Sequence, residues 1–83
     1  MEIYDDVENE NSKGYVVLNM IRNISESIDL LLKNGMNLTV PSNASISISN
    51  KEIAIYDKEN KEITYILTEE IIGVINKARR KNV

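Results

Sequence analysis

The first pattern of hydrophobic residues along the chain has the period of an α-helix. Between Ser12 and Gly35, apolar residues recur at alternating spacings of four and three, which lines one face of an α-helix. Ser12 suits the N-cap of such a helix, and Gly35 suits the left-handed position that ends one. The pattern therefore predicts one long helix over residues 12–34. Its apolar stripe consists of Val17, Ile21, Ile24, Ile28 and Leu31, widened by Met20 and Leu32.

Residues 45–67 change to the period of two that is typical of half-buried strands. A polar connection around Pro41 precedes them, and the residues just before it either begin a short strand or cover the helix end. Two polar turns divide the alternating segment into a three-stranded antiparallel meander. A tight turn at 50–51 pairs Ile48 with Ile53 and Ile46 with Ile55, so all four isoleucines share one face.

The second turn, in the polar stretch DKENK at 57–61, permits two registers. If Asp57 opens a type I turn and Asn60 takes the left-handed conformation, Ile63 pairs with Ile55. A two-residue turn at 59–60 pairs Ile63 with Tyr56 instead and divides the apolar residues between both faces. Because a buried face penalises that division, the first register is favoured. It predicts an inner face of Ile46, Ile48, Ile53, Ile55, Ile63, Tyr65 and Leu67.

The end of the chain predicts a second helix that starts at Thr68, a suitable N-cap. The sequence IIGVI at 71–75 also suits a strand, and this alternative stays open. One helix precedes the meander in the chain and one follows it, and both must cover its single apolar face. We therefore predict a two-layer α+β fold. Residues 1–11 are acidic and aperiodic, so we expect a mobile tail before a single domain over residues 12–83.

The amino-acid composition limits the catalytic and metal-binding chemistry that the chain can perform. The chain has 83 residues, no Cys and no His. The common nucleophile–base pairs and most transition-metal ligands are therefore missing, and we predict a protein that is not an enzyme and holds no cofactor or metal. No apolar run has the length of a membrane span and no signal peptide is apparent, so we expect no membrane contact and a cytoplasmic location. A small core without disulfides favours a homodimer.

Two surfaces are candidates for binding. The favoured register gives the outer sheet face a small, uncharged middle row that permits close approach of a flat partner. The candidate partner-binding residues are Ser47, Ala54, Tyr56, Thr64 and Ile66. Simple solvation of this face is the competing interpretation. The stripe of the long helix is a second candidate for contact between two copies, and burial of that stripe within its own subunit is the alternative.

Charge is unevenly distributed along a chain of net charge −3. The first twelve residues hold five acids, and a basic cluster near the end is the candidate nucleic-acid site. The cluster consists of Lys77, Arg79, Arg80 and Lys81. No stacking aromatic residue lies among these cations and the whole chain is acidic, so solvated charges at a helix end are the favoured interpretation.

These observations favour a small non-enzymatic protein-binding modulator or inhibitor that acts as a homodimer on a larger protein. Its size and composition are typical of phage-encoded antagonists, and its Ile, Asn, Lys and Glu content is typical of a phage or a low-GC bacterium. One alternative is a nucleic-acid-associated regulator that uses the basic cluster. Another is a small-ligand or nucleotide-binding dimer with its site between subunits.

Overall fold

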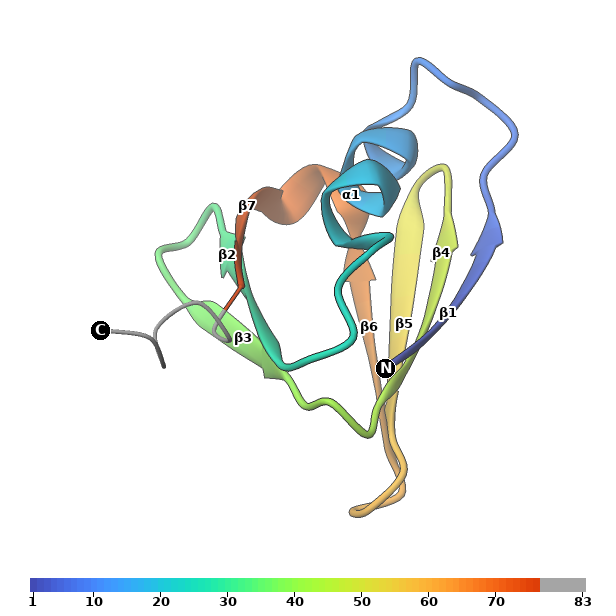
Figure 1. The fold of residues 1–83 in the computed structure, drawn as a ribbon. Helices are drawn as coiled ribbons and strands as arrows, with labels where there is room; N and C mark the ends of the chain where they lie inside the picture. The colour runs from blue at the N-terminus through green and yellow to red at the C-terminus, as the bar shows by residue number, and fades with distance from the viewer. Residues whose placement is uncertain (77–83) are drawn as a thin grey trace.

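A computed structural model describes residues 1–76 of the chain. Two sheets face each other, and a short helix crosses the gap between them at one end (Figure 1). The first sheet has the order β1-β4-β5-β6, formed by β1 (Glu2–Asp6), β4 (Ser45–Ser49), β5 (Glu52–Asp57) and β6 (Glu62–Leu67). The second has the order β3-β2-β7, formed by β3 (Asn37–Val40), β2 (Ile28–Leu32) and β7 (Ile71–Asn76). The helix is α1 (Lys13–Ile21), and a 3₁₀ turn, η1 (Thr68–Glu70), joins β6 to β7.

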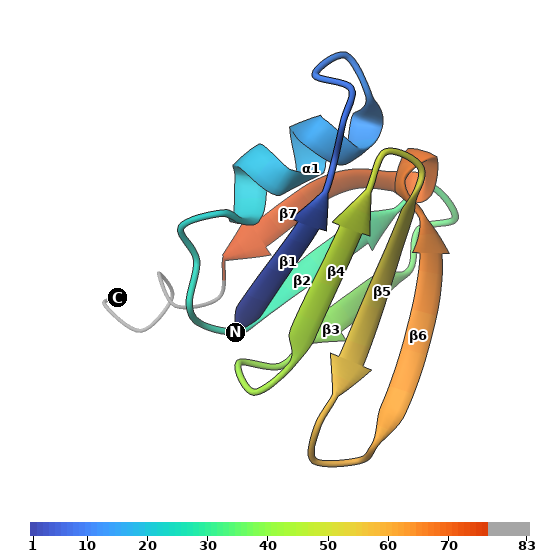
Figure 2. The same cartoon turned by 90° about the vertical axis from the view of Figure 1, so that its right-hand side faces the viewer.

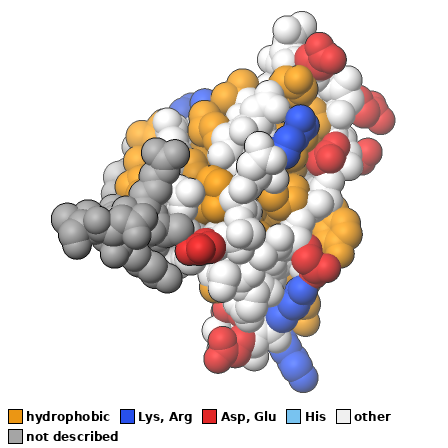
Figure 3. Space-filling view, viewed as in Figure 1, with side chains coloured by type: hydrophobic (Ala, Val, Ile, Leu, Met, Phe, Trp, Pro, Cys, Tyr) orange, Lys and Arg blue, Asp and Glu red, His pale blue; other side chains and the backbone are white. Residues whose placement is uncertain are grey.

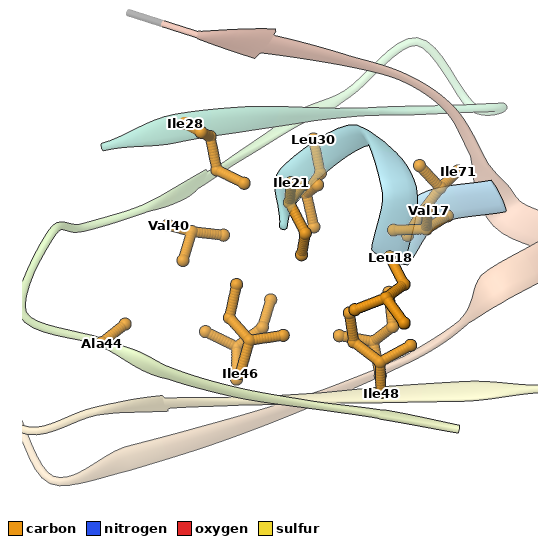
Figure 4. Close-up of a cluster of buried hydrophobic side chains, with 12 residues drawn as sticks. Val17, Leu18, Ile21, Ile28, Leu30, Val40, Ala44, Ile46, Ile48 and Ile71 are labelled. Carbon is orange, nitrogen blue, oxygen red and sulfur yellow. The ribbon is translucent and has the colours of Figure 1, made fainter. Parts of the chain in front are cut away.

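The hydrophobic core lies between the two sheets. Figure 4 shows side chains of β2 and β3 pointing toward those of β4, with side chains of α1 filling the space beside them. The packing of the two sheets and α1 against one another removes apolar surface from water, and this burial is the main stabilising contribution in a small domain. The buried hydrophobic residues are Val17, Leu18, Ile21, Ile28, Leu30, Val40, Ala44, Ile46, Ile48, Ile53, Ile55 and Ile71.

The predicted two-layer α+β fold with a long N-terminal helix and a C-terminal helix is wrong. Of the described residues, 49% lie in strands and 16% in helical turns. The first helix does begin after Ser12, whose hydroxyl accepts a hydrogen bond from the N–H of Tyr15 at 3.2 Å. It ends at Ile21, however, because the following segment, NISES, is rich in residues that compete with the helical backbone. Residues 28–32 then pair with β3 and β7 as a strand.

Gly35 keeps its predicted left-handed conformation, with φ of 85°, but in a different role. It turns the chain between β2 and β3, where its N–H donates to the carbonyl of Leu32 at 3.0 Å. Over the described residues 68–76 the predicted C-terminal helix is not formed either, because η1 lasts three residues and Ile71–Asn76 form β7. The β-branched residues of IIGVI therefore form a strand, which is the alternative that the sequence pattern left open.

The acidic segment at the start supplies strand β1, where a mobile tail was expected. Residues 2–6 pair in parallel with β4, which places Ile3 opposite Ile46. Ile3 and Val7 are half-buried against the core. Two apolar contacts and a ladder of backbone hydrogen bonds thus hold this segment on the sheet.

The predicted strand register is correct for one hairpin of the meander and wrong for the other. The first register is confirmed, with Ile46 opposite Ile55 and Ile48 opposite Ile53. The second is wrong by one residue, since Ile63 lies opposite Tyr56 and Thr64 opposite Ile55. A shift of one residue exchanges the two faces of a strand. Three predicted inner residues of β6 therefore point outward: Ile63, Tyr65 and Leu67, with 56%, 66% and 50% of their surface exposed.

The turn itself explains the shift. The Asp57 carboxylate accepts the N–H of Glu59 at 3.1 Å and the N–H of Asn60 at 3.3 Å, and the Asn60 amide donates to its second oxygen at 2.9 Å. These bonds keep Asn60 within the turn, and the left-handed residue is Lys61, with φ of 55°. One more residue therefore lies in the loop, and β6 starts with its faces exchanged.

This turn gives a prediction about glycine. Lys61→Gly is expected to raise the free energy of unfolding by up to about 1 kcal/mol, because glycine adopts positive φ without a clash. Asn60→Gly is expected to lower it by roughly 0.5 kcal/mol, because the side-chain bond to Asp57 is lost. Urea denaturation of both variants measures the difference. Stabilisation by Asn60→Gly alone would contradict the observed register.

A close backbone contact joins α1 to the turn between β4 and β5. The N–H of Gly14 donates to the carbonyl of Asn50 at 3.2 Å. A Cβ at position 14 would lie 2.1 Å from the Ser49 carbonyl oxygen, so only glycine fits there. The Asn50 side-chain oxygen accepts the N–H groups of Glu8 and Asn9 at 3.0 and 3.1 Å. This junction holds the loop after β1, the start of α1 and the β4–β5 turn together.

Candidate functional site

The outer face of the four-stranded sheet is the candidate functional site. It faces the viewer in Figure 2, turned away from α1 and from the second sheet. The strand registers arrange its side chains in three rows that cross β1, β4, β5 and β6 in that order. The first row is Glu2, Ser45, Tyr56 and Ile63. The second is Tyr4, Ser47, Ala54 and Tyr65. The third is Asp6, Ser49, Glu52 and Leu67.

The middle row has small side chains at its centre, which we call the floor, and an aromatic ring at each end. Ser47 and Ala54 are small residues on the two central strands, and a tyrosine stands at each end of the row. Tyr4 and Tyr65 expose 57% and 66% of their surfaces, and Tyr56 in the adjacent row exposes 38%. Three of the four tyrosines of the chain therefore lie on one face. Such rings offer apolar area together with a hydroxyl that can donate a hydrogen bond.

The predicted binding residues are partly brought together here. Ser47, Ala54 and Tyr56 lie on the outer face, as the first hairpin required. Thr64 and Ile66 lie on the opposite side of β6, and Ile66 packs against the core. Their places on the outer face are taken by Ile63, Tyr65 and Leu67, which the favoured register places on the inner face.

Tyr4 was missed because β1 was not predicted. The alternation of Glu2, Ile3 and Tyr4 is a signal for a strand, but it is too short to stand out in an acidic segment. The parallel pairing with β4 joins residues about 43 positions apart, as in the pair Glu2 and Ser45. Local periodicity carries no information about a partner at that distance.

Charge on the outer face is concentrated at its two ends. Glu2 forms an ion pair with Lys58 and accepts the Ser45 hydroxyl at 3.1 Å. The hydrogen bond from Lys58, followed by the one from Ser45, holds the pKa of the Glu2 carboxyl below its usual value. The same pairing raises the pKa of Lys58. At the other end, Asp6 and Glu52 lie in the third row, and Figure 3 shows red acidic and orange hydrophobic side chains along the right-hand margin, where this face is seen in profile.

The Glu2 carboxyl predicts a pH dependence. Because its pKa is lowered in the folded state, its stabilising contribution is present above the unfolded pKa and is lost as pH falls through the folded pKa. Glu2→Gln is therefore expected to reduce the free energy of unfolding at pH 7 and to have no effect in acid, near pH 2. Urea titrations of wild type and variant at both pH values measure this. The difference at pH 7 should shrink in 0.5 M NaCl, and a difference of equal size at both pH values would contradict the assignment.

The helix stripe is the second surface considered. Val17 and Ile21 are buried within the subunit, so the alternative of internal burial holds for this part of the stripe. Met20 remains 42% exposed and lines a shallow hollow of about 470 Å³ together with Ile24, Val74 and Asn76. Orange side chains gather over α1 and β7 at the upper left of Figure 3.

A larger hollow, of about 540 Å³, lies beside the Gly14–Asn50 junction. Its polar lining includes Ser12 and Thr68, and both serve the fold. Ser12 caps α1, and the Thr68 hydroxyl donates to the Asn50 carbonyl at 3.1 Å. Among residues 1–76, no three or more His, Cys, Asp or Glu side chains are grouped so that they could hold a metal ion.

Two further predictions concern the chain ends and membranes. The basic cluster of Lys77, Arg79, Arg80 and Lys81 lies outside the described residues. Within the described part, no helix has the length and apolar character needed to cross a membrane.

Comparison with protein-family models, curated proteins and solved structures found no match. The geometry of the outer sheet face therefore has to indicate the function.

Proposed function

We propose that the protein is a non-catalytic binding module that recognises another protein through the outer face of its four-stranded sheet. The observation that carries this proposal is the middle row, in which exposed Tyr4 and Tyr65 flank the small residues Ser47 and Ala54. Tyrosines are enriched at protein interfaces because they bury much area with few rotatable bonds. A small-residue floor lets a flat surface reach the backbone of the sheet.

The charges on this face specify the chemistry of the partner. Asp6 and Glu52 lie at one end, beside Leu67, whereas Glu2 at the other end is already paired with Lys58. A partner surface that is apolar at its centre and carries Lys or Arg at one end complements this arrangement. The same acids disfavour nucleic acid, because phosphate groups would approach negative charge.

Photo-cross-linking in an extract of the cells that make the protein tests this proposal. The photoreactive residue p-benzoylphenylalanine replaces Tyr4 or Tyr56 on the outer face, or Tyr15 on α1 as the control. We expect one adduct of the same mass from positions 4 and 56 and none from position 15. Ser47→Arg, which fills the centre of the floor, should abolish the adduct, while Asn19→Arg on α1 should retain it.

The protein's thermal unfolding provides the folding control for each variant. Ser47 and Asn19 are both exposed, so neither substitution should change the melting temperature by more than a few degrees. An adduct from position 15 alone, or one that survives Ser47→Arg, would show that the partner binds elsewhere.

A further inference from the structure

Strand β6 has an unpaired edge. Within residues 1–76 it pairs with β5 and with no other strand, so its second side presents backbone N–H and C=O groups to solvent. Exposed strand edges are templates for pairing with another chain, and natural proteins protect them with charge, proline or bulges. We propose that two copies of this chain pair antiparallel along β6.

The two edges of the four-stranded sheet differ in protection. β1, at one edge, carries Glu2, Asp5 and Asp6, and like charges would repel a second copy there. β6, at the other edge, has no charge and no proline between Ile63 and Leu67. Its three outward side chains are apolar or aromatic, and each is at least half exposed. Of the two edges of the four-stranded sheet, β6 is therefore the one suited to self-association.

Symmetry restricts the register of such a pair. A two-fold axis perpendicular to the sheet keeps each face on its own side, so a residue must oppose one that points to the same face. Centring the axis on Tyr65 sets Tyr65 against its own copy and Ile63 against Leu67 of the second copy. Centring it on Thr64 sets Leu67 against Lys61 and Glu62 against Ile66. The first register pairs all three exposed residues with apolar partners, so we assign the axis to Tyr65.

This pairing joins two four-stranded sheets into one of eight strands. The middle row of one copy, which ends at Tyr65, then continues directly into the middle row of the other. The outer faces of the two copies form one surface with the Tyr65 pair at its centre. The pairing itself needs only the free edge of β6, and it holds whether or not the outer face binds the proposed partner.

Sedimentation and cysteine cross-linking of the full chain test this inference. Sedimentation equilibrium at micromolar concentration is expected to give about twice the chain mass of 9.4 kDa. Tyr65→Lys sets two like charges against each other and is expected to weaken the dimer at least tenfold, with roughly unchanged melting of the dilute monomer. Tyr4→Lys, at the opposite edge, should leave the dimer intact while it impairs the proposed partner binding.

The absence of cysteine makes the register directly measurable. Under mild oxidation, Tyr65→Cys should give a disulfide-linked dimer, whereas Tyr4→Cys should not. Ile63→Cys and Leu67→Cys should each remain unlinked alone and link when mixed. A chain that sediments as a monomer at all micromolar concentrations would overturn the inference. So would a dimer in which Tyr65→Cys fails to link.

Discussion

Ile48→Ala is expected to lower the free energy of unfolding by about 3 kcal/mol, or to unfold the domain outright. Ile48 is fully buried on β4, opposite Ile53, and belongs to the core that both sheets and α1 share. Its removal leaves a cavity that the surrounding strands cannot close. The milder Ile48→Val, expected to cost about 1 kcal/mol, keeps the effect measurable if the alanine variant does not fold.

The matched control is Ile63→Ala on β6. Ile63 is 56% exposed, so the same chemical change is expected to cost less than about 1 kcal/mol. Urea denaturation at low protein concentration, where the domain is studied without self-association, gives both values. Equal costs for Ile48→Ala and Ile63→Ala would mean that β6 turns its apolar residues inward, contrary to the structure.

Gly14→Ala is expected to lower the free energy of unfolding by about 2–3 kcal/mol. Alanine normally stabilises a helix by about 1 kcal/mol relative to glycine, so the expected sign is opposite to the local preference. The cause is the added Cβ, which would lie 2.1 Å from the Ser49 carbonyl oxygen and must push α1 away from the β4–β5 turn. That movement would also weaken the hydrogen bond from Gly14 N–H to the Asn50 carbonyl.

Gly73→Ala serves as the control for this substitution. At position 73 the nearest atom to an added Cβ is Cδ1 of Leu31, at 3.3 Å, and this end of a flexible side chain can move. The change is expected to cost less than about 1 kcal/mol. Thermal and urea unfolding of both variants measure the difference, and a Gly14→Ala protein more stable than wild type would show that the contact with Ser49 does not exist.

The elements that local pattern specifies were predicted from the sequence. The β4–β5 hairpin follows from four alternating isoleucines around a tight turn, and the start of α1 follows from Ser12 as N-cap. The positive φ at Gly35 was also predictable, because glycine is the residue that adopts it readily.

The remaining elements depend on pairings between distant segments. The apolar spacing from Val17 to Leu31 fits a helix stripe, but it also fits a short helix followed by a strand that pairs with β7. Only the tertiary contact between β2 and β7, some forty residues apart in the chain, decides between them. β1 likewise depends on its parallel partner β4.

For the candidate site, the sequence correctly placed Ser47, Ala54 and Tyr56 on one face but misplaced the side chains of β6. The error arose from requiring every apolar residue of the meander to be buried. An edge strand is held by a single neighbour, and its turn can set the register even when that exposes hydrophobic side chains. Tyr65 on the outer face is therefore a consequence of the positive φ at Lys61.

The β5–β6 register determines which side chains form the outer face, because it places the exposed residues of β6 beside Tyr56 and Ala54. Disulfide formation within the chain tests it most directly, since directly opposed residues on antiparallel strands lie within disulfide range. The double variant Tyr56→Cys/Ile63→Cys should close an internal disulfide under mild oxidation, because these positions are opposite each other. The pair Ala54→Cys/Thr64→Cys, which is opposite only in the other register, should stay reduced. Closure of the second pair and not the first would contradict the observed register.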